Sequence, residues 1–235
     1  GCEPKGNNNY GKDTTETVYK AIPMSKDGDK TARVATGTGP VTWSHDGTLG
    51  GIWDMNGNVW EWCTGLRLVY GEIQILQDNN AADPTADLSA GSAAWKAINA
   101  ADGSLVTPDG NGTTAGTVKL NYASSKWNYS TTITGTKGAY GCGFASVTAD
   151  ATIGDAAKVL LQALAMLPDT ALTGTGIDTS YGGDYFYIDN NQAERCLIRG
   201  GSWGTGSDAG LFRSDLYRSR SYADGIVGGR SAFID

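Results

Sequence analysis

Residues 51–62 read GIWDMNGNVWEW, and the interpretation of the fold starts from this stretch. Asn56, Gly57 and Asn58 favour a tight turn, because Asn and Gly tolerate the positive φ angles that such turns require. After the turn, Trp60 and Trp62 alternate with a glutamate, which is the pattern of a short strand that buries one face. We therefore expect a Trp-rich strand here that organises the core.

Segments outside this stretch carry weaker patterns. Residues 5–42 are polar and rich in Asn, Gly and Thr, which favours loops with short strands. The spacing of apolar residues predicts strands over 68–76, 117–122 and 130–134, and a short helix over 92–99. The strongest helix prediction covers residues 156–167, just before Pro168. Its apolar residues at helical spacing are Ala156, Val159, Leu160, Ala163, Leu164 and Leu167.

Composition and charge restrict the function. The chain has 235 residues, enough for one domain with a sizeable core or for one domain with a large insertion. Its net charge of −7 and its pI of about 4.7 argue against a general binder of nucleic acid or of anionic membranes, which needs a basic face. Residues 195–235 differ, because they hold six Arg, no Lys and four Asp. We therefore expect an Arg-weighted surface on an acidic body.

Membrane and processing signals are weak. The longest apolar run, residues 159–167, contains Gln162 and ends at Pro168, whereas a bilayer span needs ~20 apolar residues. No membrane insertion is therefore expected. Gly1 is not a methionine and no basic-then-apolar leader follows it, so we expect a processed or N-terminally shortened chain.

Catalytic constellations are hard to assemble from these residues. His45 is the single histidine, which excludes metal sites built on two or three histidines, and it is expected to be a turn residue. Neither a GxGxxG segment after a strand nor a phosphate-binding loop occurs. The cysteines are widely spaced, and both disulfides and free thiols stay open for them: Cys2, Cys63, Cys142 and Cys196. We expect no enzymatic activity.

Two segments resemble signatures of one family. GNVWEW at residues 57–62 resembles a signature of the formylglycine-generating-enzyme branch of the C-type lectin fold, and RGGSW at residues 199–203 matches a second one. The resemblance implies an α+β, C-type lectin fold over residues 1–235 as a single domain, with a long central insertion over 66–180. It also implies that the N- and C-terminal parts share one sheet. Four tryptophans are then expected to be largely buried: Trp53, Trp60, Trp62 and Trp203.

The same resemblance implies a metal site. In that family a calcium ion can be held by a side chain at the position of Asp54, by the carbonyls at Gly57 and Val59, and by the carboxylate at Glu61. Oxygen-only ligation of this kind suits calcium. The alternative is that these groups cap the turn, in which case no cofactor is required.

The C-terminal text points to one subfamily. Oxidase members of the family carry two reactive cysteines near their C-terminal end and others hold iron with histidines, but no cysteine follows Cys196 here. The text instead resembles the variable proteins of diversity-generating retroelements, including those of gut phages and bacteria. In those proteins RGGSW opens a variable region, here residues 199–235. The chain departs from the pattern at Ser214, where Leu is usual, and at Gly229, where Phe is usual, so looser packing is expected there.

The variable positions implied by this resemblance define the predicted binding surface, within residues 204–227. Along 212–217, we expect Phe212, Ser214 and Leu216 to face inward and the residues between them to face outward. Gly200, Gly201 and Trp203 are expected to be scaffold. The predicted site is Gly204, Thr205, Ser207, Asp208, Arg213, Asp215, Tyr217, Arg218, Tyr222, Ala223 and Asp224. Tyr, Arg and small polar residues are also the chemistry of antibody paratopes.

A residue count bears on the same identification. Such retroelements randomise adenines in codons of the AAC type and keep a pyrimidine third base, so Lys, Glu, Gln, Met and Trp cannot arise. The chain holds ten Lys, five Glu, four Gln, three Met and seven Trp. None lies in residues 204–235, where an even spread places about four. The count supports a variable tail.

These observations together predict a noncovalent ligand- or receptor-binding protein. Its partner is expected to be a protein or a glycan on a cell surface, and the chain is expected to sit on a phage virion or a bacterial surface. One alternative is a structural virion or pilus component whose tail is merely a surface. A second is an oxidase-like member of the formylglycine-generating-enzyme family, which the missing cysteines and histidines disfavour.

Overall fold

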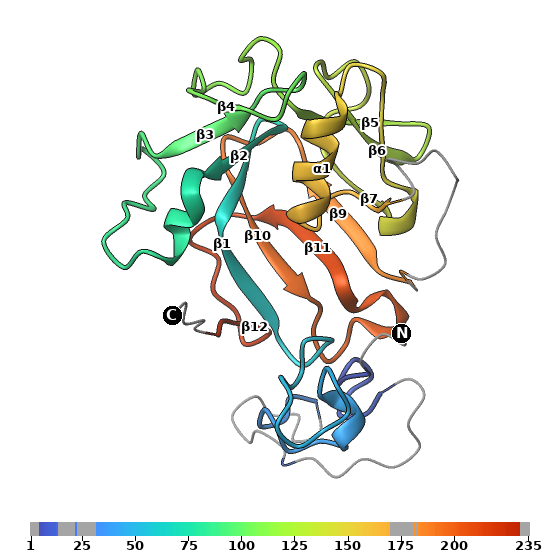
Figure 1. Cartoon of the computed structure of the whole chain (residues 1–235). Coiled ribbons are helices and arrows are strands. Elements are labelled where there is room, and N and C mark those ends of the chain that lie inside the picture. Colours follow the sequence, from blue (N-terminus) through green and yellow to red (C-terminus); the bar gives the residue numbers. More distant parts are fainter. Residues whose placement is uncertain (1–4, 14–21, 23–31, 170–180, 182, 231–235) are drawn as a thin grey trace.

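The computed structural model of the chain describes residues 5–13, 22, 32–169, 181 and 183–230. Within them, twelve strands form one mixed sheet and a single α-helix packs against it (Figure 1). The fold is therefore α+β and dominated by its sheet. The strands are β1 (Trp60–Val69), β2 (Glu72–Leu76), β3 (Trp95–Ile98), β4 (Leu105–Val106), β5 (Lys119–Ala123), β6 (Lys126–Ser130), β7 (Ala139–Gly143), β8 (Thr148–Ala149), β9 (Tyr185–Asp189), β10 (Arg195–Gly200), β11 (Gly210–Arg218) and β12 (Val227–Gly228). The helix is α1 (Asp155–Ala163), and the 3-10 helices are η2 (Val41–Trp43), η3 (Gln77–Ala82), η4 (Phe144–Ser146) and η6 (Gly206–Asp208).

The sheet joins segments from both ends of the sequence. Its order is β7-β9-β11-β10-β1-β2-β5-β6-β8, with β12 paired to β1 and β3 paired to β2 and β4. Trp62 of β1 lies opposite Ile198 of β10 in an antiparallel ladder. β9 pairs with β11 in parallel, although β10 separates these two strands in the sequence. β1, which begins in the Trp-rich segment, thus shares one sheet with the C-terminal strands β10, β11 and β12, whereas the described residues before residue 60 add no named strand to it.

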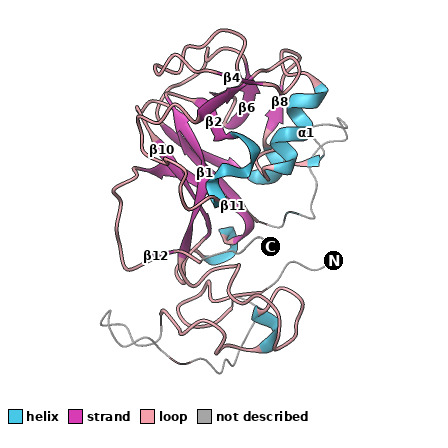
Figure 2. Ribbon diagram, turned by 60° about the vertical axis from the view of Figure 1, so that its left-hand side comes forward, coloured by secondary structure: helices cyan, strands magenta, loops and turns pink. Residues whose placement is uncertain are grey.

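The two motif segments are hydrogen-bonded to each other. Gly57 donates its N–H to the Gly200 carbonyl at 2.9 Å, and Trp203 donates to the Asn58 carbonyl at 3.0 Å. Asn58 in turn donates to the Asn7 carbonyl at 2.6 Å. Gly57 (φ 79°) and Asn58 (φ 60°) adopt positive φ angles, as the predicted tight turn requires. The described loops at residues 5–13 and 32–58 gather at one end of the molecule, next to this junction (Figures 1 and 2).

The helix prediction over 156–167 is confirmed in type, because α1 covers Asp155–Ala163. The buried side differs from the expected one: Ala157 and Leu161 are buried, whereas Val159 is 53% exposed. The helix ends at Leu164, and Ala165 then takes a positive φ of 51° that turns Met166 into the core. No helix in the described ranges has both the length and the apolar character needed to cross a membrane.

Several other local predictions are wrong in an instructive way. Residues 92–99 form β3 instead of a helix, because Trp95 and Ala97 pair with Leu76 and Gln74 of β2. The expected strand over 68–76 is two strands, since the chain reverses at Tyr70–Gly71. Of the strand expected over 130–134, only Ser130 is in a strand, as the last residue of β6. The strand predicted over 117–122 corresponds to β5.

The predicted tryptophan burial is found only in part. Trp60 is buried, but Trp53, Trp62 and Trp203 are only partly buried, so the prediction is confirmed for Trp60 alone. Trp62 lines a small cavity of about 220 Å³ together with Leu88, which keeps part of its ring accessible. The tryptophans with no exposed surface are Trp43 and Trp127.

Candidate ligand-binding surface

β11 carries the centre of the predicted site. It lies between β9 and β10, and Asp215 pairs with Tyr187 of β9. Since side chains alternate along a strand, every second residue of β11 shares a face with every second residue of β9. We call this face the outer face; it consists of Arg213, Asp215 and Tyr217 of β11 and Tyr185 and Tyr187 of β9.

The opposite face of β11 packs into the core as expected. Leu216 and Ser214 are fully buried, and Phe212 stacks on Phe144 with ring centroids 5.2 Å apart. Ser214 does not loosen the packing. Its hydroxyl accepts a hydrogen bond from Arg199 at 2.8 Å and donates one to the Phe212 carbonyl at 3.0 Å. The serine therefore serves as the partner of a buried guanidinium, a role that leucine could not fill. Around Gly229, by contrast, there is open space, as the missing Phe suggested.

The prediction that Arg213, Asp215 and Tyr217 all reach solvent is wrong for two of them. Asp215 is only 5% exposed and the Arg213 side chain only 12%, whereas Tyr217 is 37% exposed. The physical reason is position within the sheet. β9 and β10 flank β11. On β9, the Tyr185 ring lies against the Arg213 side chain, and Tyr187 is the residue opposite Asp215. Burial raises the pKa of the Asp215 carboxyl above its ordinary value.

Arg213 is held between two aromatic rings. Its guanidinium carbon lies 5.1 Å from the Trp60 ring centroid and 5.0 Å from that of Tyr185. Its Nη1 also lies 3.7 Å from the Asp208 carboxylate of η6, which joins the loop before β11 to the outer face. Burial lowers the pKa of this guanidinium, and the nearby carboxylates oppose that shift. Among the described residues, Nε and Nη1 of Arg213 have no hydrogen-bond acceptor.

The exposed end of the outer face is a Tyr–Arg cluster. The Arg218 guanidinium lies 4.3 Å from the Tyr222 ring centroid and 5.0 Å from that of Tyr217. The Tyr217 ring meets Tyr187 edge-on at 5.5 Å, and Arg195 lies 5.7 Å above it. Burial raises the pKa of the Tyr222 phenol, and the Asp224 carboxylate adds to that shift while Arg218 opposes it. Four residues of the predicted site thus come together here.

The other predicted residues lie in the flanking loops. Thr205 is partly buried, and its hydroxyl accepts the Ser202 N–H at 2.8 Å. Gly204 is exposed and faces the Tyr10 hydroxyl, which a Cβ at this position would meet at 3.3 Å. Ser207 and Ala223 are also exposed. Gly204, Thr205 and Ser207 lie before β11 in the chain, and Ala223 follows Tyr222 in the loop after β11.

The sequence analysis missed the aromatic contribution of β9. Tyr185 and Tyr187 lie on the outer face because β9 runs parallel to β11, a pairing of segments separated by β10 in the chain. Gly141 of β7 makes room for Tyr185, since a Cβ there would stand 2.2 Å from the ring. The alternation of residues 185–189, Tyr-Phe-Tyr-Ile-Asp, was a strand signal that could have revealed two more outward tyrosines.

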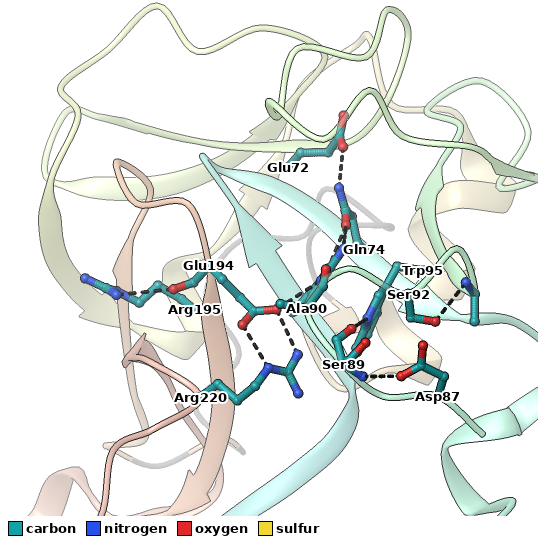
Figure 3. A network of polar contacts seen from close by, with 12 residues as sticks. Glu72, Gln74, Asp87, Ser89, Ala90, Ser92, Trp95, Glu194, Arg195 and Arg220 are labelled. Atoms are coloured by element: carbon teal, nitrogen blue, oxygen red, sulfur yellow. Dashed lines mark hydrogen bonds and ion pairs between the residues drawn. The ribbon is translucent and has the colours of Figure 1, made fainter. Parts of the chain in front are cut away.

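A polar network fixes the start of the loop that follows β11. Arg220 donates to both carboxylate oxygens of Glu194, at 3.0 and 2.8 Å (Figure 3). The Glu194 carboxylate also accepts from Arg67 at 3.0 Å. From there the hydrogen bonds continue through Gln74 to the fully buried Glu72 (Figure 3). Bidentate arginine–carboxylate pairs are geometrically specific, so residue 220 is a fixed point from which residues 221–226 project.

The two carboxylates predicted to hold calcium, those of Asp54 and Glu61, accept hydrogen bonds from Gly37 and Arg230. Both Glu61 carboxylate oxygens accept Nε of Arg230 at 2.8 Å, and Nη2 of Arg230 donates to the Trp53 carbonyl at 3.0 Å. A guanidinium thus takes the place that a cation would need beside Glu61. Burial raises the pKa of the Asp54 carboxyl to about 6, and its Oδ2 accepts the Gly37 N–H at 3.3 Å. Within the described ranges no group of three or more His, Cys, Asp or Glu side chains could hold a metal ion. The residues fit the turn-capping alternative better than calcium.

Comparisons with known proteins assign neither a family nor a function to the chain. Neither a protein-family model nor a curated protein sequence matches the chain.

The described cysteines Cys63, Cys142 and Cys196 are free thiols, and burial raises the pKa of Cys63 and of Cys196. A thiol with a raised pKa is a poor nucleophile at neutral pH. The arrangement is suited to binding through rings and guanidinium groups.

Proposed function

We propose that the chain is a noncovalent ligand-binding protein whose contact surface is the outer face with its Tyr–Arg cluster and the flanking loops at 204–208 and 219–226. In this proposal residues 199–235 are a hypervariable region diversified by a retroelement, carried on a C-type lectin fold of the formylglycine-generating-enzyme type. The ligand is a protein or a glycan on a cell surface. The chain acts on a phage virion or on a bacterial surface.

The observation that carries the proposal is the surface placement of Arg218 between the rings of Tyr217 and Tyr222. Tyrosine offers a large amphipathic contact area at low cost in conformational entropy, and arginine adds forked donors. Both residue types are frequent at the energetic centres of interfaces. Here they lie at variable positions of one strand and its following loop, where substitution can alter the ligand without altering the core.

Guanidinium groups stacked on tyrosine rings support a binding surface over a merely structural one. The Arg195 and Arg218 guanidinium groups both lie against the Tyr217 ring. Guanidinium groups offer forked donors that suit a ligand with carboxylate, phosphate or carbonyl oxygens.

Sequencing of sibling genes from one population tests the proposed diversification. We expect amino-acid differences to concentrate at the predicted variable positions, above all Arg213, Asp215, Tyr217, Arg218 and Tyr222. The core face of β11 should stay constant, because its residues support the fold. Differences spread evenly over the chain would contradict the proposal and leave an ordinary surface.

A binding experiment tests the contact surface directly. Tagged protein is incubated with intact bacteria of the same community, and bound protein is measured by flow cytometry. Truncation of a central tyrosine can cost ~2 kcal/mol or more, so Tyr217→Ala and Tyr222→Ala are expected to lose most binding to any strain that the unaltered chain labels. Val159→Ala, on the exposed side of α1, is the matched control. Equal labelling by all three variants would place the contact surface elsewhere.

A further inference from the structure

A second concave site lies outside the outer face. It is a hollow of about 720 Å³ formed by the loops at 111–116 and 131–133 around the turn between β1 and β2. Lys119 and Lys137 also line it. This volume is in the range of small-molecule sites, ~300–1,000 Å³. None of its lining residues belongs to the proposed variable surface, so the hollow needs its own explanation.

Tyr70 lines this hollow and has an unfavourable backbone conformation. Its φ is 46° and that of Gly71 is 90°, and this pair of positive angles is typical of a two-residue hairpin turn of type I′. Asn is strongly preferred at the first of these positions, whereas a bulky residue with positive φ is an outlier. The Tyr70 N–H donates to the Gln192 carbonyl at 2.8 Å, which holds the turn in place.

Packing does not explain the choice of tyrosine at this position. The Tyr70 side chain is 40% exposed, and its ring and hydroxyl have no partner among the described residues. Backbone strain kept where no packing demands it is grounds for a functional hypothesis. Tyr70 lines the hollow, so the exposed part of this residue borders the space where a ligand would lie.

The loops at 111–116 and 131–133 pack closely against the Tyr70–Gly71 turn. A Cβ at Gly112 would stand 2.3 Å from the Val69 carbonyl oxygen, and a Cβ at Gly71 would stand 2.4 Å from Cδ1 of Ile133. Both loops therefore contact the Tyr70–Gly71 turn closely, and only glycine allows the approach. A hollow assembled in this way is formed before a ligand arrives, which lowers the cost of ordering it on binding.

The polar groups of the lining are free to bind a ligand. The Asn111 amide, the Thr131 and Thr132 hydroxyls and the Lys137 ammonium have no partner among the described residues, while Lys119 donates to the Thr114 carbonyl at 2.7 Å. No carboxylate lines the hollow, although the chain as a whole carries a charge of −7. The site thus combines one exposed ring, neutral donors and acceptors, and one unpaired cation.

We propose that this hollow binds a carboxylated sugar unit, such as a hexuronic acid. The apolar C–H face of the sugar packs on the Tyr70 ring, because an exposed aromatic face gains from covering apolar surface. The sugar hydroxyls bond to Asn111, Thr131 and Thr132, which supply both donors and acceptors. Lys137 pairs with the carboxylate through a charge-assisted hydrogen bond. The site is separate from the proposed variable surface and does not depend on it.

Saturation-transfer NMR with free glucuronic acid, and with glucose as the uncharged counterpart, tests this site on the full chain. We expect transfer to glucuronic acid at low salt, weaker transfer to glucose, and a loss of the difference in Lys137→Gln. Tyr70→Asn is the decisive variant. Asn-Gly is a preferred pair for this turn, so this variant is expected to fold at least as stably as the unaltered chain while its affinity for glucuronic acid falls ~10-fold or more.

Tyr70→Phe is the matched control, because it keeps the ring and removes the hydroxyl; its affinity is expected to stay within ~3-fold of the unaltered chain. Absence of transfer to either sugar, or equal transfer in Tyr70→Asn, would overturn the proposal. Equal binding of glucose and glucuronic acid would overturn the role of Lys137. A failure here and a failure of the cell-labelling experiment are distinguishable, because the two experiments use different residues and different probes.

Discussion

The two faces of β11 differ in what covers them. On the core face, Ser214 and Leu216 are fully hidden by the hydrophobic core. On the outer face, the exposed fraction rises from 5% at Asp215 to 37% at Tyr217. Alternation determines which face a side chain occupies, but its neighbours determine how much solvent it reaches, because β11 lies between two other strands. A strand in the interior of a sheet, such as β11, therefore exposes only part of its outer face.

Leu216→Ala is expected to give the largest effect and tests the core face. Removal of this fully buried side chain should lower the free energy of unfolding by ~2–5 kcal/mol, because the cavity left behind closes only in part. Chemical denaturation measures the change. Leu216→Met conserves the volume and should cost less than ~1.5 kcal/mol. Equal stability of Leu216→Ala and the unaltered chain would show that the two faces are assigned in reverse.

Arg213→Ala tests the covered part of the outer face. We expect a loss of ~1–2 kcal/mol in the free energy of unfolding, because the guanidinium packs between the Trp60 and Tyr185 rings and its stem covers apolar surface. Arg213→Lys keeps the charge but not the flat stacking group, so an intermediate loss is expected. A change within about ±0.5 kcal/mol would instead be typical of an exposed side chain and would remove the distinction drawn here.

Asp215→Asn tests the burial of the same face through pH. Burial raises the folded-state pKa of this carboxyl, so its contribution to stability is complete below the unfolded pKa and is lost as pH rises through the folded value. The free energy of unfolding of Asp215→Asn relative to the unaltered chain should therefore increase as pH rises from ~4 toward neutrality. The effect is expected to be smaller than that of Arg213→Ala. Asp224→Asn, in an exposed loop, is the control, and an identical pH response in both variants would argue against burial of Asp215.

Tyr217→Ala tests the exposed end of the outer face. Its free energy of unfolding should stay within about ±0.5 kcal/mol of the unaltered chain, because a residue open to solvent contributes little to stability. Thermal melts need no ligand and compare this variant directly with Leu216→Ala. A loss as large as that of Leu216→Ala would mean that the strand faces the other way and that the proposed surface is wrong.

Removal of metal ions with a chelator is expected to leave the melting temperature unchanged. The experiment tests whether an ion pair or a metal ion stabilises the start of β1. The Glu61–Arg230 pair satisfies this turn without a metal, so the melting temperature should be the same in excess chelator. A ligand that binds only the folded state raises the melting temperature by linkage. A decrease on chelation would therefore restore a calcium site at Asp54 and Glu61.

Local patterns predicted the elements whose causes are local. The positive φ angles at Gly57 and Asn58 follow from residue type, and α1 follows from apolar spacing and a nearby proline. The helix predicted over residues 92–99 was wrong, because strand pairing with β2 outweighs a short helical pattern. Contacts between segments distant in sequence often override such local preferences. Three site residues implied by the resemblance, Tyr217, Arg218 and Tyr222, lie together. The exposure of Arg213 and Asp215 was overestimated.

The sequence by itself determined which residues of β11 share a face, because alternation is a property of the extended backbone. It also determined the excess of Arg and Tyr in the last part of the chain and the absence of a histidine cluster. Only the tertiary structure decided that β9 lies parallel to β11 and brings Tyr185 and Tyr187 beside Arg213 and Tyr217. Strand order depends on which distant segments bury the most apolar surface together, and that competition is settled by the whole chain rather than by any local pattern.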